Sequence, residues 1–193
     1  MVGRIISLTS AAYFRLTSSI YLKICRVKTS GRVRLSGFPL IKNKGRISLG
    51  AGCDFRSLSS FTALGVPHRC IFNTFSSNSE IIIGKDCGFS GAVICAKERV
   101  IIGDRVQIGS GAVICDTDFH PLDYNIRGSD DDLILAESSP VSIGDDCFIG
   151  ARTIILKGVS VGARTIVGAG SVVTKNVPAD VVVAGNPAKN VRK

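Results

Sequence analysis

The 193-residue sequence lacks an uninterrupted apolar stretch of the length that a membrane span requires. The most apolar N-terminal part, residues 3–25, is broken by Arg15 and Lys23 well short of the usual ~20 residues. No small-x-small cleavage site follows this short run, so the pattern of a secretory signal peptide is also missing. We therefore expect neither a transmembrane helix nor a cleaved leader.

Acidic residues are missing from the first quarter of the chain. Ten Lys and Arg precede Asp54, the first acid, so the formal net charge of +9 belongs to this segment and not to the remainder. The sequence also has no zinc-ligand spacing, aromatic platform motif or recognition-helix signature. Without these features the basic charge does not indicate nucleic-acid binding.

What the sequence does contain is a period of six residues. From Ile143 onward an aliphatic residue, usually followed by Gly or another small residue, returns at every sixth position. These beats are Ile143, Ile149, Ile155, Val161, Val167 and Val173. Upstream the same beat falls on Ile83, Phe89 and Cys95 and, after one extra residue, on Ile102, Ile108 and Ile114. A fixed short period indicates one repeated structural unit.

An α-helix does not explain this period, because six residues match neither the ~3.6 nor the ~3.5 residues per turn of helices. Short strands joined by tight turns fit better. Three hexads would close a triangular coil, with the aliphatic residue inward and small residues at the corners. The fifth hexad position must also be small, and it is occupied by Cys87, Val106, Cys147, Thr153, Thr165 and Ser171. The pattern predicts a one-domain, all-β solenoid.

The seven cysteines fit this solenoid as packing residues. None forms a C-x-x-C pair, which argues against a metal site, and an odd number cannot all pair in disulfides within the chain. Cys87 and Cys147 hold small corner positions and Cys95 an aliphatic one, so we expect buried thiols. Unpaired thiols are typical of a reducing compartment, which indicates the cytoplasm. Buried thiols are also inert, which argues against an acyl-cysteine intermediate.

Three segments resemble the hexapeptide-repeat acyltransferases, in particular the branch of the maltose, galactoside and colanic-acid O-acetyltransferases. These segments are DTDFHP at 116–121, VGAGSVVTK at 167–175 and AGNPAK at 184–189. The resemblance is good over residues 80–193 and looser before them. It implies a left-handed parallel β-helix, which opposes the usual right-handed crossover preference. It also implies a homotrimer, with acetyl-CoA bound as co-substrate between subunits.

On this basis the chain divides into a basic N-terminal helix or cap (1–28), a β-helix acyltransferase domain (29–183) with an excursion loop at 119–142, and a basic C-terminal tail (184–193). The expected helix has apolar residues four apart. They are Leu8, Ala12, Leu16 and Ile20, with Ile5 and Tyr13 nearby. We favour a cap that packs this face on the open end of the solenoid. The alternative is weak peripheral contact with anionic lipid at the inner face of the membrane.

The repeat is interrupted between Ile114 and Val141 by a segment that keeps no hexad beat and opens with His120. Long loops on a rigid scaffold are frequently functional. An imidazole titrates near neutrality and suits proton removal from a sugar hydroxyl or amine as it attacks a thioester. The resemblance gives this general-base role to the histidine of a His-Pro motif, which His120 and Pro121 match. The alternative is a turn residue; the other histidine, His68, is interpreted as structural.

A general base needs a group that orients its other ring nitrogen. Asp118, Asp116 and a backbone carbonyl are the candidates, and the alternation of an extended chain favours Asp118, because it would lie on the same side as His120. The acids at 130–132 are interpreted as a solvated loop tip.

The resemblance also implies a path for coenzyme A, whose phosphates call for cations and exposed N–H groups. Gly150, Ala151 and Ala169 would line the pantetheine, and Thr174 and Lys175 would lie near the phosphates. Lys189 and Arg192 occupy positions where the galactoside enzymes have arginines; Lys189 keeps the charge but loses the bidentate fork. The alternative for this group is a solvated basic C-terminus.

The acceptor is the least determined part. Ser90 lies near the position where the galactoside and maltose enzymes present an Asn and a sugar-contacting acid, which argues against a free disaccharide. The DTDFHP form looks more like enzymes of polysaccharide and O-antigen biosynthesis. We therefore expect O-acetylation of a surface-glycan sugar, contacted by Ser90, Phe119, Tyr124 and Arg127. N-acetylation of a nucleotide-linked amino sugar and a non-catalytic trimeric scaffold are the alternatives.

Overall fold

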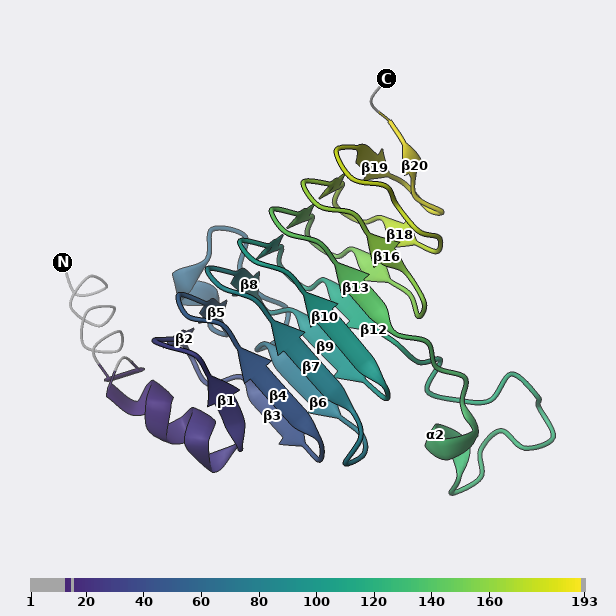
Figure 1. Ribbon diagram of the computed structural model, residues 1–193, viewed down its shortest axis with the longest axis horizontal. Coiled ribbons are helices and arrows are strands. Elements are labelled where there is room, and N and C mark those ends of the chain that lie inside the picture. The colour runs from purple at the N-terminus through teal and green to yellow at the C-terminus, as the bar shows by residue number, and fades with distance from the viewer. Residues whose placement is uncertain (1–12, 15, 192–193) are drawn as a thin grey trace.

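The computed structural model describes residues 13–14 and 16–191, which form a three-sided solenoid of stacked coils (Figure 1). Each coil gives one strand to each of three sheets, which we call A, B and C. Equivalent strands of successive coils pair in parallel, and only β19 and β20 pair antiparallel within the sheets. The prediction of a parallel β-solenoid is confirmed.

The elements have the following bounds. Sheet A contains β1 (Val27–Thr29), β4 (Arg46–Leu49), β7 (Glu80–Ile83), β10 (Arg99–Ile102), β13 (Val141–Ile143) and β16 (Ser160–Val161). Sheet B contains β2 (Arg34–Ser36), β5 (Asp54–Arg56), β8 (Gly88–Ser90), β11 (Gln107–Ile108), β14 (Phe148–Ile149), β17 (Ile166–Val167), β19 (Val182–Ala184) and β20 (Lys189–Asn190). Sheet C contains β3 (Leu40–Asn43), β6 (Ile71–Thr74), β9 (Val93–Ala96), β12 (Val113–Cys115), β15 (Ile154–Ile155) and β18 (Val172–Val173). Helical residues 13–14 and 16–24 precede β1, and the 3-10 helix η1 (Ser59–Phe61) and helix α2 (Asp132–Leu135) lie in loops.

The core is the predicted aliphatic column. From Ile143 onward, all six beat residues are at most 2% exposed. The predicted beat is wrong at one upstream position, where Ile94 and not Cys95 faces the core. Ile94 pairs in register with the fully buried Ile114, so the alternation of the strand turns Cys95 to the outer side. The hexad therefore loses one residue at this coil.

The corners are closed by small residues, as the hexad predicts. All six residues at the fifth hexad position are buried. Their polar side chains donate to carbonyls of neighbouring turns: Cys147 Sγ to Gly162 O at 3.1 Å and Thr165 Oγ1 to Pro178 O at 2.8 Å. Gly150 shows how closely corners stack, because a Cβ there would lie 2.4 Å from the nitrogen of Ala169 in the next coil. A larger residue would force successive coils apart.

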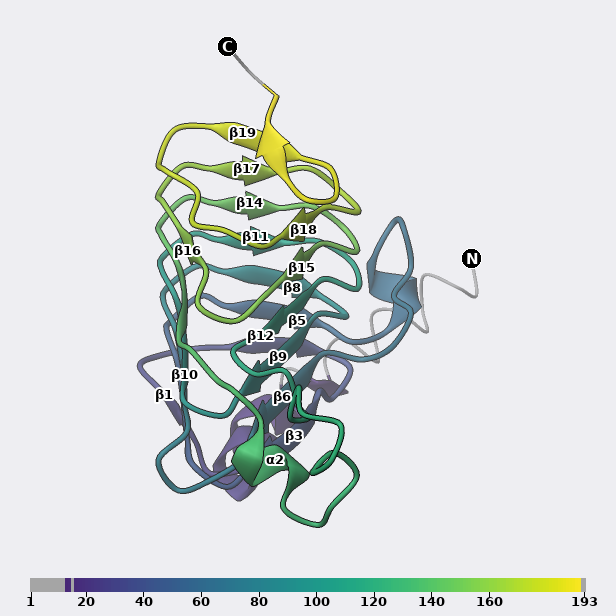
Figure 2. The same ribbon diagram turned by 90° about the vertical axis from the view of Figure 1, so that its right-hand side faces the viewer.

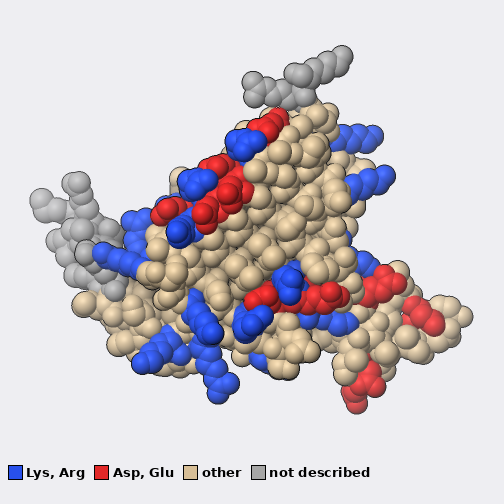
Figure 3. All heavy atoms as spheres, viewed as in Figure 1, with Lys and Arg blue, Asp and Glu red and all other residues tan. Residues whose placement is uncertain are grey.

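The edge between sheets A and B carries a row of alternating charges (Figure 3). Arg105 pairs with Asp146, and Arg164 with Asp180, and in each pair Nε and Nη2 of the guanidinium donate to the two carboxylate oxygens. All four residues have a positive φ of 57–63°, which sets the tight turn at this corner. The guanidinium hydrogen bonds lower the pKa of Asp146 and of Asp180. Exposed pairs of this kind contribute little stability, so their main effect is to neutralise the edge.

The N-terminal helix lies across the open end of the solenoid (Figure 1). Its buried side carries Ser18 and Leu22, and Tyr21 Oη donates to Pro39 O at 2.5 Å. The rings of Tyr21 and Phe38 pack at 4.6 Å between centroids. The helix therefore does cover the end, but not with the predicted face, because the described members of that face, Leu16 and Ile20, are exposed. Leu8, Ala12 and Ile5 lie outside the described residues.

The predicted divisions differ from the structure at four places. The boundary at 28/29 falls inside β1, and the tail from 184 onward is not separate, because β20 folds back and pairs with β19. The excursion ends before β13, so we define the His120 loop as residues 119–140. A second excursion, residues 57–70, leaves the edge between sheets B and C and was not foreseen as a loop (Figure 2).

The N-terminal coils contain an aromatic cluster, and a substitution in it tests how tightly the core is packed. Phe55, Phe72 and Phe89 are at most 1% exposed, with centroids 4.8 Å apart for Phe55 and Phe89. Phe89→Ala should lower the free energy of unfolding by about 3–5 kcal/mol, because it leaves a cavity between coils that cannot collapse. Urea denaturation followed by circular dichroism measures the change. Leu64→Ala, in the second excursion and 82% exposed, is the control and should stay within about 0.5 kcal/mol; equal losses in the two variants would contradict this packing.

Candidate active site

The His120 loop leaves the edge between sheets C and A on a hydrogen-bonded stem. Thr117 forms an antiparallel bridge with Ser138, and Asp118 N donates to Glu137 O at 3.1 Å. Asp116, fully buried below this stem, accepts three backbone N–H groups at 2.7 Å, from residues 97, 98 and 99. Both its oxygens are occupied, so Asp116 anchors the stem and is not available to His120.

Helix α2 lies in the arm of the loop that returns to the solenoid, and one lysine holds it there. Lys97 Nζ donates to Ile134 O at 2.8 Å and to Ala136 O at 2.5 Å. These carbonyls lie at the C-terminal end of α2, where intrahelical partners are missing and a cation is favourable. The contact ties α2 to the turn between β9 and β10. It thereby fixes Asp132, the first residue of α2, relative to the solenoid.

His120 meets Asp132 across the loop. Its Nδ1 lies 2.5 Å from Asp132 Oδ2, while Gly128 N donates to the other oxygen, Oδ1, at 2.8 Å. The Asp132 side chain is 13% exposed and that of His120 is 63% exposed. The carboxylate therefore holds the Nδ1 edge of the ring and leaves the Nε2 edge in solvent. In the described part of the chain, Nε2 has no hydrogen-bond partner.

This contact sets the chemistry of the ring. The hydrogen bond from His120 lowers the pKa of Asp132, so the carboxyl is ionised at neutral pH. A carboxylate can only accept, so the neutral imidazole carries its proton on Nδ1 and its lone pair on Nε2. The exposed nitrogen is then the basic one, and a carboxylate stands ready to stabilise the imidazolium after proton transfer. The arrangement fits a general base for a substrate that arrives from solvent.

The prediction that Asp118 orients His120 is wrong, because Asp118 has another partner. Lys157 Nζ binds Asp118 Oδ2 at 2.6 Å and Glu137 Oε2 at 2.7 Å, and these hydrogen bonds raise the pKa of Lys157. Asp118 thus points to the next coil. Simple alternation fails because Phe119 has a φ of 65°, in the left-handed region, which turns the chain between Asp118 and His120.

The loop tip is also only partly as predicted. Asp130 is exposed, but Asp132 is buried and is the residue that orients His120. Of the three loop residues predicted to contact an acceptor, Tyr124 is exposed and Phe119 packs edge-on against Phe75, with centroids 6.0 Å apart. Arg127 donates to the loop's own carbonyls, Pro121 O at 2.9 Å and Leu122 O at 2.6 Å. Its guanidinium stabilises the loop.

The residues predicted to bind coenzyme A lie on two different edges. Gly150, Ala151 and Ala169 follow strands of sheet B and precede strands of sheet C. Thr174 and Lys175 follow β18 on the C–A edge, the edge from which the His120 loop leaves. Lys189 lies in β20, and Arg192 is outside the described residues. Within one chain, sheet C separates the small corner residues from His120.

Comparisons with known proteins identify the repeat. Residues 140–175 match the model of the hexapeptide repeat of succinyl-transferase. A hexapeptide-repeat-containing acetyltransferase from Vibrio cholerae has a TM-score of 0.53 and 32% sequence identity, over 64% of this chain and 69% of that one. The chain belongs to the hexapeptide-repeat acetyltransferase family. Its fold is therefore the predicted left-handed β-helix, and the resemblance read from the three motifs is confirmed.

Two curated relatives act on different bond types. Galactoside O-acetyltransferase from Escherichia coli is 34% identical over 62% of this chain and 57% of the relative. The 2,3,4,5-tetrahydropyridine-2,6-dicarboxylate N-acetyltransferase of Staphylococcus aureus is 42% identical over 47% of this chain and 32% of the relative. The chain spans about half the length of the first curated relatives that it matches. Both O- and N-acetyltransferases thus occur among the relatives of this chain.

In this hexapeptide-repeat protein the second excursion borders the B–C edge. Ser110 Oγ donates to Gly65 O at 2.7 Å, and a Cβ on Gly91 would lie 2.5 Å from His68 O. Ser90, predicted to contact the acceptor, ends β8 directly beside this loop. The second excursion was not predicted, although Pro67 and the loss of the hexad beat around it could have indicated a loop. His68 Nδ1 contacts Arg69 O at 2.9 Å, which agrees with a structural role.

The role of Asp132 in ordering the loop is testable. Asp132→Ala removes the acceptor for both His120 Nδ1 and the Gly128 N–H, so hydrogen exchange over residues 119–137 should accelerate about tenfold or more. Hydrogen exchange followed by mass spectrometry measures this. Asp130→Ala, two residues away and exposed, is the matched control and should leave the exchange unchanged. Similar exchange in both variants would show that Asp132 does not hold the loop.

Proposed function

We propose that this protein transfers the acetyl group of acetyl-CoA to a sugar hydroxyl, with His120 as the general base. The observation that carries the proposal is the His120–Asp132 contact, which leaves Nε2 exposed on a loop that Lys97 anchors to the solenoid. Membership of the hexapeptide-repeat acetyltransferase family and the galactoside O-acetyltransferase relative support the reaction class.

The reaction follows from the position of the proton on His120. The acceptor hydroxyl gives its proton to Nε2 as its oxygen attacks the thioester carbon, and Asp132 stabilises the imidazolium. Collapse of the tetrahedral intermediate breaks the carbon–sulfur bond. The proton on Nε2 then passes to the leaving thiolate, so that acetyl ester and free coenzyme A are the products and neutral His120 is restored.

The residues of the B–C edge fit an extended pantetheine arm. Gly150, Ala151 and Ala169 carry no side chain beyond a methyl group, so a ligand could approach the backbone at Ala151 and Ala169. Gly150 is buried and its N–H donates to Val167 O, so it contributes only by leaving space. At the C–A edge, Thr174 and Lys175 are exposed, and Lys175 takes part in no ion pair of the described structure. A free ammonium is suited to a phosphate of coenzyme A.

Because sheet C separates the two edges, we place the cofactor between two copies of the chain. The outer face of sheet C supports this placement, since one position of its register is aliphatic in every coil. These residues are Leu40, Ile71, Val93, Val113, Ile154 and Val172. The equivalent outer columns include polar residues: Lys28 and Ser48 in sheet A, and Arg34 and Asp54 in sheet B. An apolar sheet face is typical of an obligate interface, and three copies related by a threefold axis would bury it.

For the acceptor we favour a sugar of a surface polysaccharide or its precursor. This sugar would lie between His120 of one copy and Ser90 with the second excursion of the neighbouring copy. The second candidate is N-acetylation of a nucleotide-linked amino sugar, which the N-acetyltransferase relative keeps open. The product distinguishes the two: an ester is cleaved by mild alkali, and an amide is stable.

Transfer of labelled acetyl from acetyl-CoA to free sugars, nucleotide sugars and glycan fragments tests the function. His120→Ala should lower kcat/KM about 10²–10⁴-fold with the fold intact, because the base is lost. Asp132→Asn should lower kcat by about tenfold or more, because the amide no longer fixes the ring tautomer. Asp130→Asn is the matched control, with unchanged kinetics. Absence of both product and acetyl-CoA binding would favour the scaffold alternative.

A subunit-mixing experiment tests the shared site. His120→Ala and Ala169→Glu copies should each be inactive alone, the second because the new side chain blocks the pantetheine path. In randomly mixed trimers about a quarter of the sites would combine two intact edges, so about a quarter of wild-type activity should return. Native mass spectrometry verifies that mixed trimers form. Mixed trimers without activity would mean that one chain supplies both edges.

A further inference from the structure

The outward side of the N-terminal helix carries an exposed apolar stripe. Its members are Tyr13, Leu16, Ile20 and Ile24, which are 55%, 78%, 62% and 75% exposed. They recur at intervals of three and four, so they share one side of the helix. Ser18 and Leu22, on the other side, are 2% and 3% exposed against the solenoid. The helix thus has two apolar sides. On the outward side the ring of Tyr13 still reaches Phe38, with centroids 6.2 Å apart, whereas Leu16, Ile20 and Ile24 face away from the solenoid and are exposed.

Cations without ion-pair partners occur at the same end of the solenoid as this stripe. Arg34 and Arg46 pair with Asp54 and Glu80, but the remaining described cations of the helix and first coil form no ion pair. These are Lys23, Arg26, Lys28, Arg32, Lys42 and Lys44. No acid occurs before Asp54, and in Figure 3 the lower left end of the molecule carries blue side chains and no red ones. Further along the solenoid, by contrast, Arg105 and Arg164 on the A–B edge are each neutralised by an aspartate of a neighbouring coil.

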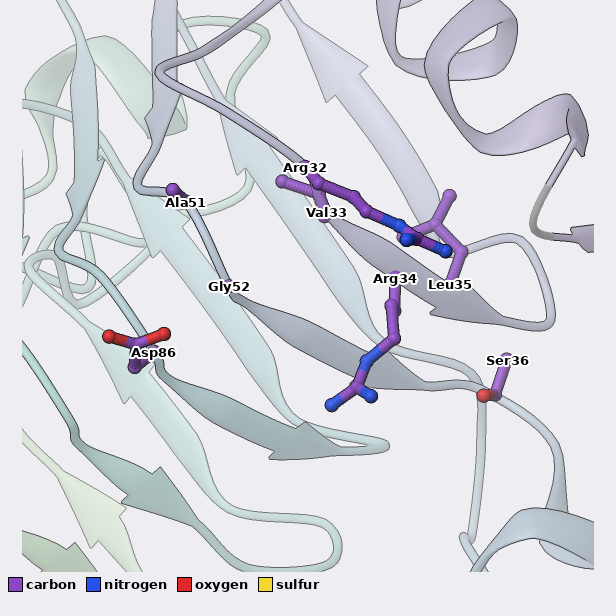
Figure 4. Close-up of a pocket in the computed structure, with 8 residues that line it drawn as sticks. All are labelled: Arg32, Val33, Arg34, Leu35, Ser36, Ala51, Gly52 and Asp86. Carbon is purple, nitrogen blue, oxygen red and sulfur yellow. The ribbon is translucent and has the colours of Figure 1, made fainter.

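A hollow opens beside the helix at the same end. It has a volume of about 680 Å³ and is lined by residues of the first coils (Figure 4). Its apolar lining includes Val33 and Leu35, and Arg32 and Arg34 project from the same strand region, with Asp86 on the other side. Arg34 is paired with Asp54, but the Arg32 guanidinium has no ion-pair partner in the described structure and suits a phosphate group. The hollow lies in the first coils, away from the His120 loop.

We propose that this end of the solenoid docks on the surface of an anionic membrane. The stripe would enter the boundary between headgroups and acyl chains, and the six cations would lie over the headgroup phosphates. None of the helices in the described ranges is long and apolar enough to span a bilayer, so the contact is peripheral. A second copy is the poorer occupant, because end-to-end association would bring two sets of unpaired cations together.

The docking does not depend on the chemistry at His120, but it would affect which acceptors the protein meets. The helix occupies one end of the solenoid, and the His120 loop leaves its side (Figure 1). A protein bound by its end would therefore keep the loop clear of the bilayer. Acceptors carried on lipid would then be concentrated within reach of the loop.

Flotation of the full-length protein with vesicles tests the proposal. Wild-type protein should float with vesicles of phosphatidylglycerol and phosphatidylcholine and not with phosphatidylcholine alone. It should be released at about 1 M salt, where the Debye length falls to about 3 Å. Leu16→Ser with Ile20→Ser should weaken the partition coefficient about tenfold or more. Arg26→Gln with Lys28→Gln should weaken it roughly thirtyfold, at about 1 kcal/mol for each charge.

Matched controls separate docking from general effects. Leu64→Ser, an equally exposed apolar residue outside the stripe, and Lys175→Gln with Lys189→Gln, two lysines at the opposite end, should bind vesicles like wild type. Circular dichroism verifies the fold of each variant, and light scattering its mass. Failure of the wild type to float, or equal binding to neutral vesicles, would overturn the proposal. A changed mass of the stripe variants would instead make the stripe an interface between copies, which also overturns it.

Discussion

The close stacking of corners from coil to coil is the constraint on which the rest of the structure depends. A Cβ placed on Gly50, Gly109 or Gly150 would lie 2.3–2.5 Å from backbone atoms of the next coil, so the turns leave no room for side chains between them. Every functional group must therefore stand on an outer surface or on a segment that leaves the solenoid at a corner. The His120 loop and the second excursion are two such segments, and they leave different edges (Figure 2).

The three edges consequently differ in character. The A–B edge is occupied by ion pairs between successive coils, Arg105 with Asp146 and Arg164 with Asp180. The B–C edge exposes backbone through small residues, and the C–A edge carries the His120 loop. Between the last two lies sheet C, whose outer aliphatic column separates them within one chain. This separation is the physical reason to place a shared site between copies.

The repeat could be predicted from the sequence because it depends on local periodicity. Inward residues, small corners and the interruption before His120 all follow from counting positions, and only Cys95 is misplaced, because the core position there falls five and not six residues after Phe89. The partner of His120 could not be predicted this way. Asp132 reaches it through α2, which Lys97 holds from another coil, and the left-handed Phe119 removes the alternation that favoured Asp118.

The N-terminal helix shows a different limit. Its sequence has apolar residues on two sides, and the spacing of four residues picks out only one of them. The side with Leu16 and Ile20 is the more regular, yet Leu22 and Tyr21 on the other side meet the solenoid, because Phe38 and Pro39 offer them contacts. Only the folded first coil decides between the sides.

A crystal structure of the protein with acetyl-CoA tests the shared site most directly. We expect the thioester carbon near His120 Nε2 of one copy, with the pantetheine along Gly150, Ala151 and Ala169 of its neighbour. We also expect the His120–Asp132 contact to persist. A cofactor whose thioester and pantetheine are held by the same chain, or that lies away from His120, would contradict a site formed by two edges.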